Sequence, residues 1–73
     1  MRYTRYLHSL DVLTQYKLTE LGNQTIVERS EWWLKTGETI FQYCEPSTMR
    51  LSQGEASKLI ERLEHEGFIL ARD

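Results

Sequence analysis

The chain has 73 residues, a formal net charge of −2, 27% charged residues and 40% hydrophobic residues. This length allows one small domain over residues 1–73, and the mixture of charged and apolar residues excludes a disordered chain. The slightly acidic charge argues against a strongly basic nucleic-acid domain, and no apolar run is long enough to span a membrane.

The chain has one cysteine, Cys44, which excludes an internal disulfide. The N-terminus has no apolar segment of the kind found in signal peptides, and a lone cysteine without such a segment predicts a cytoplasmic protein, because thiols stay reduced there. A chain this short would gain extra stability from well-packed helices or from self-association as a homodimer.

The first segment runs from about residue 3 to residue 21. Its apolar side chains follow helical spacing and are Tyr3, Tyr6, Leu7, Leu10, Leu13, Leu18 and Leu21. This spacing predicts an amphipathic helix that Gly22 closes, although Asp11 is a candidate N-cap that would break the helix. A second interpretation is a β-hairpin in which residues 16–20 pair with residues 25–28 across Gly22 and Asn23.

The second segment, from about residue 25 to residue 44, also predicts a helix. One face of it would carry Ile26, Ser30, Trp33, Gly37, Ile40, Phe41 and Cys44. Pro46 would end this helix, because the residue before a proline is disfavoured in the α region. Thr36 and Gly37 are its weak point, since they would either split the helix or precede a strand at residues 39–43.

The third segment, from about residue 53 to residue 66, carries the strongest local signals. Ser52 and Glu55 have the spacing of a capping box. Apolar residues then recur on one helical face at Ala56, Leu59, Ile60 and Leu63. Gly67 suits a left-handed position after the helix, and Phe68 would fold back on the last turn. The apolar residues 68–71 either pack on the domain or form an edge strand that pairs with a partner chain.

These patterns together predict an all-α domain of three helices. The alternative is an α+β winged-helix-like fold, with short strands near Ile26 and Phe68.

The stretch Leu51–Ile69, LSQGEASKLIERLEHEGFI, resembles the recognition helix and following strand of MarR-like winged-helix regulators. In that family a Ser/Thr-rich helix start precedes a Leu-x-x-x-Leu-Glu stretch, a glycine and a strand. The resemblance covers about a quarter of the chain and lacks the β-wing, because the sequence stops at Asp73. The stretch also looks like a short helical element found at the ends of several phage and bacterial DNA-metabolism proteins. The family resemblance implies that four residues face DNA in the major groove: Gln53, Ser57, Lys58 and Arg62.

We therefore expect a small non-enzymatic DNA-associated regulator of transcription with a helix-turn-helix arrangement. Its third helix would contact DNA through Lys58, Arg62 and Ser57, and Arg2 and Arg5 would anchor phosphates. The alternative is a protein-binding module or inhibitor, of the kind encoded by phages and plasmids. It would dock through an exposed aromatic strip, where binding hot spots are common, formed by Trp32, Thr36, Thr39 and Tyr43.

The sequence carries no recognisable catalytic or metal-binding constellation. His8 and His65 are the only histidines, and neither lies near Cys44 in the sequence. The chain also lacks the paired cysteine and histidine spacing of a zinc site. Asp11 and Asp73 are the only aspartates, which argues against a carboxylate metal cluster. We expect a protein that is not an enzyme and that uses no cofactor or metal.

Overall fold

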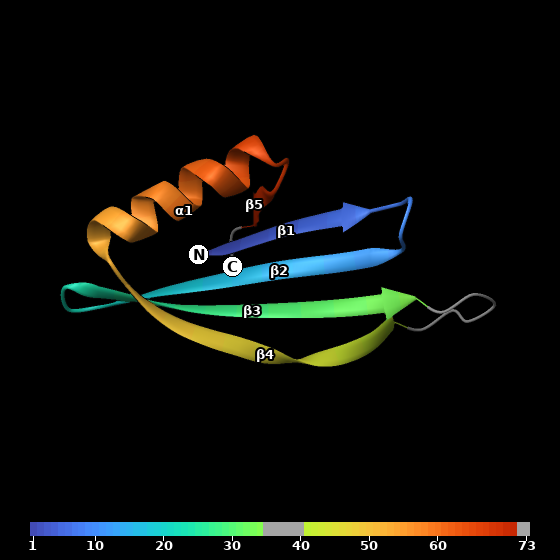
Figure 1. The fold of residues 1–73 in the computed structure, drawn as a ribbon, viewed down its shortest axis with the longest axis horizontal. Coiled ribbons are helices and arrows are strands. Elements are labelled where there is room, and N and C mark those ends of the chain that lie inside the picture. Colours follow the sequence, from blue (N-terminus) through green and yellow to red (C-terminus); the bar gives the residue numbers. More distant parts are fainter. Residues whose placement is uncertain (35–40, 72–73) are drawn as a thin grey trace.

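The computed structural model describes residues 1–34 and 41–71. These residues form one antiparallel sheet and one helix (Figure 1). In chain order the elements are β1 (Arg2–Leu7), β2 (Val12–Leu21), β3 (Gln24–Leu34), β4 (Phe41–Ser52), α1 (Gln53–His65) and β5 (Ile69–Ala71). The strand order in the sheet is β4-β3-β2-β1-β5, so the last strand returns to pair with the first.

The predicted all-α fold of three helices is wrong, and so is the helix-turn-helix arrangement. The segment expected as the first helix forms β1 and β2, and most of the segment expected as the second lies in β3 and β4. Strands do occur near Ile26 and Phe68, but they belong to a five-stranded sheet rather than to a winged helix. Pairing between neighbouring strands buries Tyr3, Leu18 and Val27 together, which no helical stripe would do.

The hairpin interpretation across Gly22 and Asn23 is confirmed, and the hairpin is longer than predicted. Pairing of β2 with β3 begins at Leu21 opposite Gln24 and continues to Val12 opposite Trp33. Gly22 has a φ of 64°, which fits a two-residue turn with glycine at its first position. Asp11 does not cap a helix: it lies in the β1–β2 loop and accepts a hydrogen bond from the Tyr6 hydroxyl at 2.8 Å.

Pro46 lies within β4, at an irregularity of the strand pairing, and does not end a helix. Arg29 pairs with Ser47 and Glu31 with Cys44, so β4 contains one residue more than β3 between these pairs. Because β4 is an edge strand and proline has no N–H to donate, this position accommodates it. The predicted break at Thr36 and Gly37 lies outside the described residues.

The prediction of a helix near residues 53–66 is confirmed by α1. The capping box is present: the Ser52 hydroxyl accepts from the Glu55 amide, and Glu55 Oε1 accepts from the Ser52 amide, both at 3.3 Å. Gly67 has a φ of 90°, as a left-handed position after a helix requires. The Phe68 amide then donates to the Leu63 carbonyl at 2.9 Å, which turns the chain back toward the sheet.

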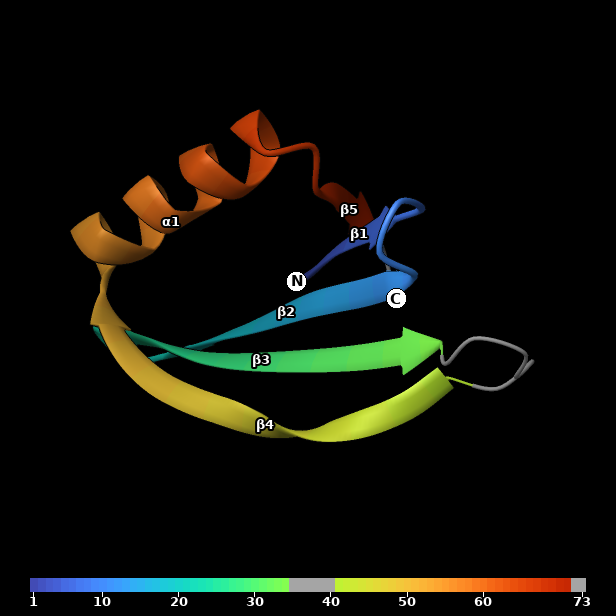
Figure 2. The same cartoon turned by 45° about the vertical axis from the view of Figure 1, so that its right-hand side comes forward.

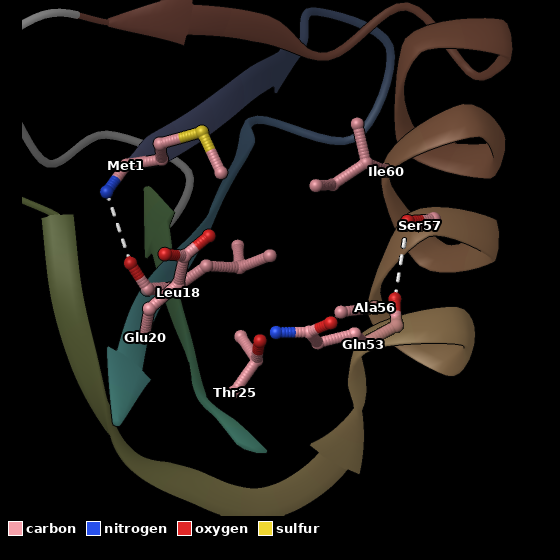
Figure 3. Close-up of a pocket in the computed structure, with 8 residues that line it drawn as sticks. All are labelled: Met1, Leu18, Glu20, Thr25, Gln53, Ala56, Ser57 and Ile60. Atoms are coloured by element: carbon pink, nitrogen blue, oxygen red, sulfur yellow. Dashed lines mark hydrogen bonds between the residues drawn. The ribbon is translucent and has the colours of Figure 1, made fainter. Parts of the chain in front are cut away.

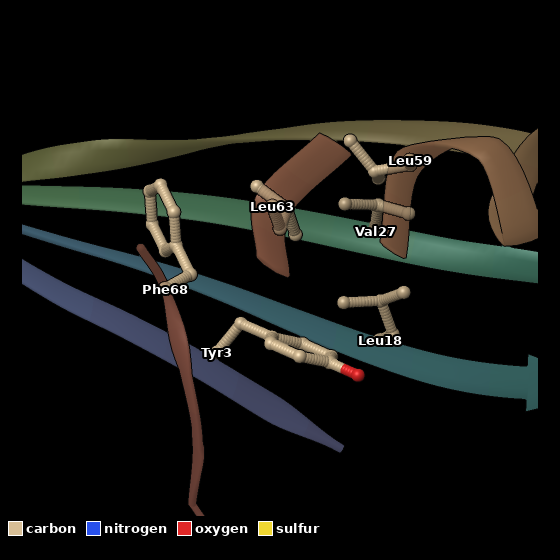
Figure 4. Packing of buried hydrophobic residues seen from close by; sticks show 6 residues of the cluster. All are labelled: Tyr3, Leu18, Val27, Leu59, Leu63 and Phe68. Carbon is tan, nitrogen blue, oxygen red and sulfur yellow. The ribbon is translucent and has the colours of Figure 1, made fainter. Parts of the chain in front are cut away.

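The hydrophobic core lies between α1 and one face of the sheet (Figure 4). Its buried residues are Tyr3, Leu18, Val27, Leu59, Leu63 and Phe68. The Tyr16 ring packs edge-on against the Phe68 ring, with centroids 5.4 Å apart. Burial of apolar surface is therefore concentrated on the α1 side of the sheet, where it supplies most of the driving force for folding.

Candidate functional site

The strands divide the sheet into two faces, because successive side chains point to opposite sides. The buried residues Tyr3, Leu18 and Val27 mark the face that α1 covers. Figure 2 shows α1 on one side of the sheet only. We call the other side the open face. From the strand register, the open face carries Arg2, Thr4, Tyr6, Leu13, Gln15, Lys17, Thr19, Leu21, Gln24, Ile26, Glu28, Ser30, Trp32, Thr48, Arg50, Ser52, Ile69 and Ala71.

One end of the open face carries a row of large side chains that crosses three strands. Tyr6 pairs with Leu13, and Leu13 pairs with Trp32. The Tyr6 ring lies edge-on to the His8 ring, with centroids 4.5 Å apart. The hydrogen bond from its hydroxyl to Asp11 raises the pKa of Tyr6, so this side chain stays neutral at physiological pH. We call Tyr6, Leu13 and Trp32 the aromatic row.

The other end of the open face is basic. Arg2 pairs with Lys17, Lys17 pairs with Glu28, and Arg50 lies opposite Ile26. We call Arg2, Lys17 and Arg50 the basic cluster. Among the open-face residues named above, these three positive charges and the single acid Glu28 give a net charge of +2, whereas the whole chain carries −2. Along β2, Lys17 and Leu13 are four residues apart, which places the basic cluster about 13 Å from the aromatic row.

The helical side of the molecule has the opposite charge. The exposed acids of α1 and its C-cap are Glu55, Glu61, Glu64 and Glu66. Lys58 and Arg62 are the basic side chains of α1. The acidic and basic charges of the chain are thus partly separated, with excess negative charge around α1 and excess positive charge on the open face.

The four helix residues that were predicted to face DNA lie on two different flanks of α1. Gln53 and Ser57 line a cleft beside β1 and β2, and the Ser57 hydroxyl donates to the Gln53 carbonyl at 3.0 Å. Lys58 and Arg62 line a groove between α1 and β4. The structure therefore does not bring the four residues together into one surface.

The two predicted phosphate anchors also lie apart, on opposite faces of β1. Arg2 is on the open face, whereas Arg5 points to the side of α1. Arg5 Nη1 donates to the Glu66 carbonyl at 3.2 Å, and the guanidinium lies 4.5 Å from the centre of the Phe68 ring. Since a cation at the end of a helix interacts favourably with its last carbonyls, Arg5 helps to fix the C-terminus of α1.

The cleft beside β1 and β2 has a volume of about 320 Å³ (Figure 3). Its lining combines apolar and polar side chains: Met1, Leu18, Glu20, Thr25, Gln53, Ala56, Ser57 and Ile60. The Met1 ammonium donates to the Leu18 carbonyl at 2.9 Å, and the Gln53 side chain points toward Thr25 across the cleft. The cleft contains one carboxylate, that of Glu20, and no histidine or cysteine. It therefore lacks the paired acid, base or nucleophile that catalysis commonly uses.

The predicted protein-binding strip is only partly covered by the structure. Trp32 in β3 and Tyr43 in β4 are directly opposite each other in the strand register. Thr36 and Thr39 lie outside the described residues. The two aromatic positions are therefore neighbours through strand pairing, whereas the sequence suggested that they were three turns apart on one helix.

Within the described ranges, no group of three or more His, Cys, Asp or Glu residues is placed to hold a metal ion. The described part of the chain also contains no helix with the length and apolar character needed to cross a membrane. Comparisons with protein-family profiles, curated proteins and solved structures found no significant match. The function is therefore inferred from the surface of the molecule alone.

Proposed function

We propose that this protein is a small non-enzymatic, DNA-associated regulator that binds single-stranded nucleic acid on the open face of its sheet. One observation carries the proposal: the aromatic row and the basic cluster share a face that α1 leaves uncovered. Proteins that bind single strands combine a positive surface that follows the backbone with aromatic side chains on which bases stack. A cytoplasmic location, consistent with the lone Cys44, is part of the proposal.

The two parts of the open face would contribute in different ways. Bases would stack on Tyr6 and Trp32, and such stacking is worth about 1–3 kcal/mol per base. Phosphates would lie near the basic cluster, where each neutralised phosphate releases a counterion and makes binding sensitive to salt. The negative charge around α1 would turn that side of the molecule away from the nucleic acid.

A single strand fits this surface better than a duplex does. Major-groove readers insert a helix that a second helix supports across the DNA backbone. Here α1 packs on the sheet through Ala56, Leu59 and Leu63, and its exposed side carries more acids than bases. A broad sheet face instead presents side chains to bases that are already unstacked and accessible.

The test measures fluorescence anisotropy of a labelled oligonucleotide of about 15 nucleotides, single-stranded and then duplex, at about 20 mM and about 200 mM salt. The first variant, Lys17→Ala with Arg50→Ala, removes two positive charges from the open face. The matched control, Lys58→Ala with Arg62→Ala, removes two positive charges from α1. A third variant, Trp32→Ala, removes the larger of the two aromatic side chains in the aromatic row. Circular dichroism confirms that each variant is folded.

We expect salt-sensitive binding that favours the single strand. The open-face double variant should bind at least tenfold more weakly, and its salt slope should fall by about 1.4, because two phosphate contacts are lost at about 0.7 each. Trp32→Ala should weaken binding by about fivefold to 150-fold, which corresponds to one stacked base. The α1 control should bind like the unaltered protein. A loss confined to that control would place the interface on α1, and absence of binding at low salt would refute the nucleic-acid function.

A protein-binding module is the second candidate, and the pairing of Trp32 with Tyr43 is the observation that favours it. Tryptophan and tyrosine are residue types that are enriched in binding hot spots, and the register places these two positions opposite each other. If no nucleic acid binds, capture of a protein partner that Trp32→Ala abolishes would support this candidate.

A further inference from the structure

A row of neutral polar side chains crosses the open face beside the aromatic row. Thr4 of β1 pairs with Gln15 of β2, and Gln15 pairs with Ser30 of β3. We call these three residues the polar row. Each of them stands two positions along its strand from a member of the aromatic row, so the two rows lie about 7 Å apart on the same face. The polar row therefore separates the aromatic row from the basic cluster.

Gln15 has the central place in the polar row and carries its longest side chain. It is the diagonal neighbour of Tyr6 on one side and of Trp32 on the other, because both of these residues pair with Leu13. Diagonal neighbours in a sheet lie about 7–8 Å apart, which is within the reach of long side chains. Gln15 is therefore placed to contact a base that stacks on either ring.

The amide group of Gln15 is available for such a contact. Within the part of the chain that the structure describes, its side chain takes part in no hydrogen bond, ion pair or ring contact. The side chain is half-buried, and its polar atoms are not among the buried atoms that lack a partner. The amide is thus accessible to solvent, with two N–H donors and one carbonyl acceptor to offer.

We infer that Gln15 makes the open face selective for adenine in single-stranded DNA, an inference that rests on the nucleic-acid function proposed above. A base that stacks on Tyr6 or Trp32 turns one edge toward the polar row. The Gln15 carbonyl accepts from the N6 amino group of adenine, and the Gln15 amide donates to the neighbouring ring nitrogen. This two-bond pairing is the characteristic contact between glutamine and adenine. A single strand leaves the base edges free for it.

The other bases match the Gln15 amide less well. Adenine presents a donor beside an acceptor on its Hoogsteen edge as well as on its Watson–Crick edge. On the Hoogsteen edge guanine has two acceptors, and cytosine and thymine have one polar group each. Arginine or lysine would favour guanine and a carboxylate would favour cytosine, but the polar row carries no charge.

The test measures anisotropy with four labelled strands of about 15 nucleotides. One is oligothymidine, and the others carry two adjacent adenines, guanines or cytosines at its centre, because the aromatic row has two rings. Gln15→Ala removes the amide. The matched control, Gln24→Ala, removes the same group from the same face, about 26 Å along β3 from Trp32. Circular dichroism confirms that each variant is folded.

The readout is the ratio of the affinities for the adenine and guanine strands, since both purines offer large rings for stacking. We expect a ratio of at least about five for the unaltered protein, the low end of the discrimination that a two-bond pairing gives. Gln15→Ala should lower the ratio to about one while salt-sensitive binding remains, and Gln24→Ala should keep the ratio of the unaltered protein. Gln15→Arg should reverse the preference, because arginine pairs with the two acceptors of guanine.

Three results would overturn this inference and leave the proposed function standing: equal affinity of the unaltered protein for the four strands, an adenine preference that survives Gln15→Ala, or one that survives Gln15→Arg. Absence of binding to every strand at low salt would overturn both the inference and the proposed function.

Discussion

Leu63 is the residue whose truncation should cost this fold the most. It is completely buried on α1 and packs in the core with Val27 and Leu18 (Figure 4). Leu→Ala changes at such sites cost about 2–5 kcal/mol, because apolar burial is lost and a cavity remains. A 73-residue domain has a total free energy of unfolding of about 4–11 kcal/mol. We therefore expect Leu63→Ala to remove about 3 kcal/mol, a large share of the total.

The loss is measured by urea unfolding at one fixed protein concentration, followed by circular dichroism and by the fluorescence of Trp32 and Trp33. The urea midpoint should fall with little change in the m-value, and the melting temperature should drop by about 12–24 °C. The matched control is Leu21→Ala, because Leu21 is 66% exposed and should lose at most about 0.5 kcal/mol. Equal losses for the two variants, or a loss below about 1 kcal/mol at Leu63, would refute this account of the core.

Three further predictions concern the two ends of α1. Ser52→Ala removes the capping hydroxyl and should lower the free energy of unfolding by about 1 kcal/mol in urea titrations. The hydrogen bonds from Ser52 lower the pKa of Glu55 in the folded protein below its ordinary value of 4.5. The stabilisation by the ionised Glu55 carboxylate is therefore fully present above pH 4.5 and is lost as the pH falls through the lowered pKa of the folded state. Unfolding midpoints of the unaltered protein and Glu55→Gln should therefore differ at pH 7 and converge in acid; a constant difference would contradict this. Gly67→Ala should lower the free energy of unfolding by about 1 kcal/mol because of the φ of 90° alone, since an added Cβ would meet no atom within 4 Å. Gly54→Ala inside α1 should instead raise the free energy of unfolding by a similar amount. Equal effects of the two variants would exclude the positive φ of Gly67 as the cause.

The sequence predicted α1 because its signals are local. Ser52, Glu55 and Gly67 act on backbone groups within one turn of themselves, so no distant part of the chain is needed to interpret them. The strands were missed because apolar residues can fit a helical stripe and still belong to different faces of a sheet. Tyr3 and Tyr6 shared one predicted helix face, yet Tyr3 is buried under α1 and Tyr6 lies on the open face.

The candidate site was harder to predict than the strands themselves. Arg2 and Trp32 were both singled out from the sequence, but in different hypotheses and for different surfaces. Their common face becomes visible only once the register of β1, β2 and β3 is known. The β-branched run Thr25, Ile26 and Val27 after Gly22 was the available signal for this hairpin, because such residues favour strands.

The pairing of β1 with β5 has a consequence for how the chain acquires its fold. Arg2 lies opposite Ala71, so residues separated by almost the whole sequence must meet before the sheet is complete. Contacts of such long sequence separation slow folding, because the loop between them must be ordered first. During synthesis β1 to β4 can pair in order as they emerge, whereas Phe68 and β5 reach the sheet last. The ribosome-bound chain would therefore keep one side of β1 and part of the core exposed until residues 68–71 have emerged.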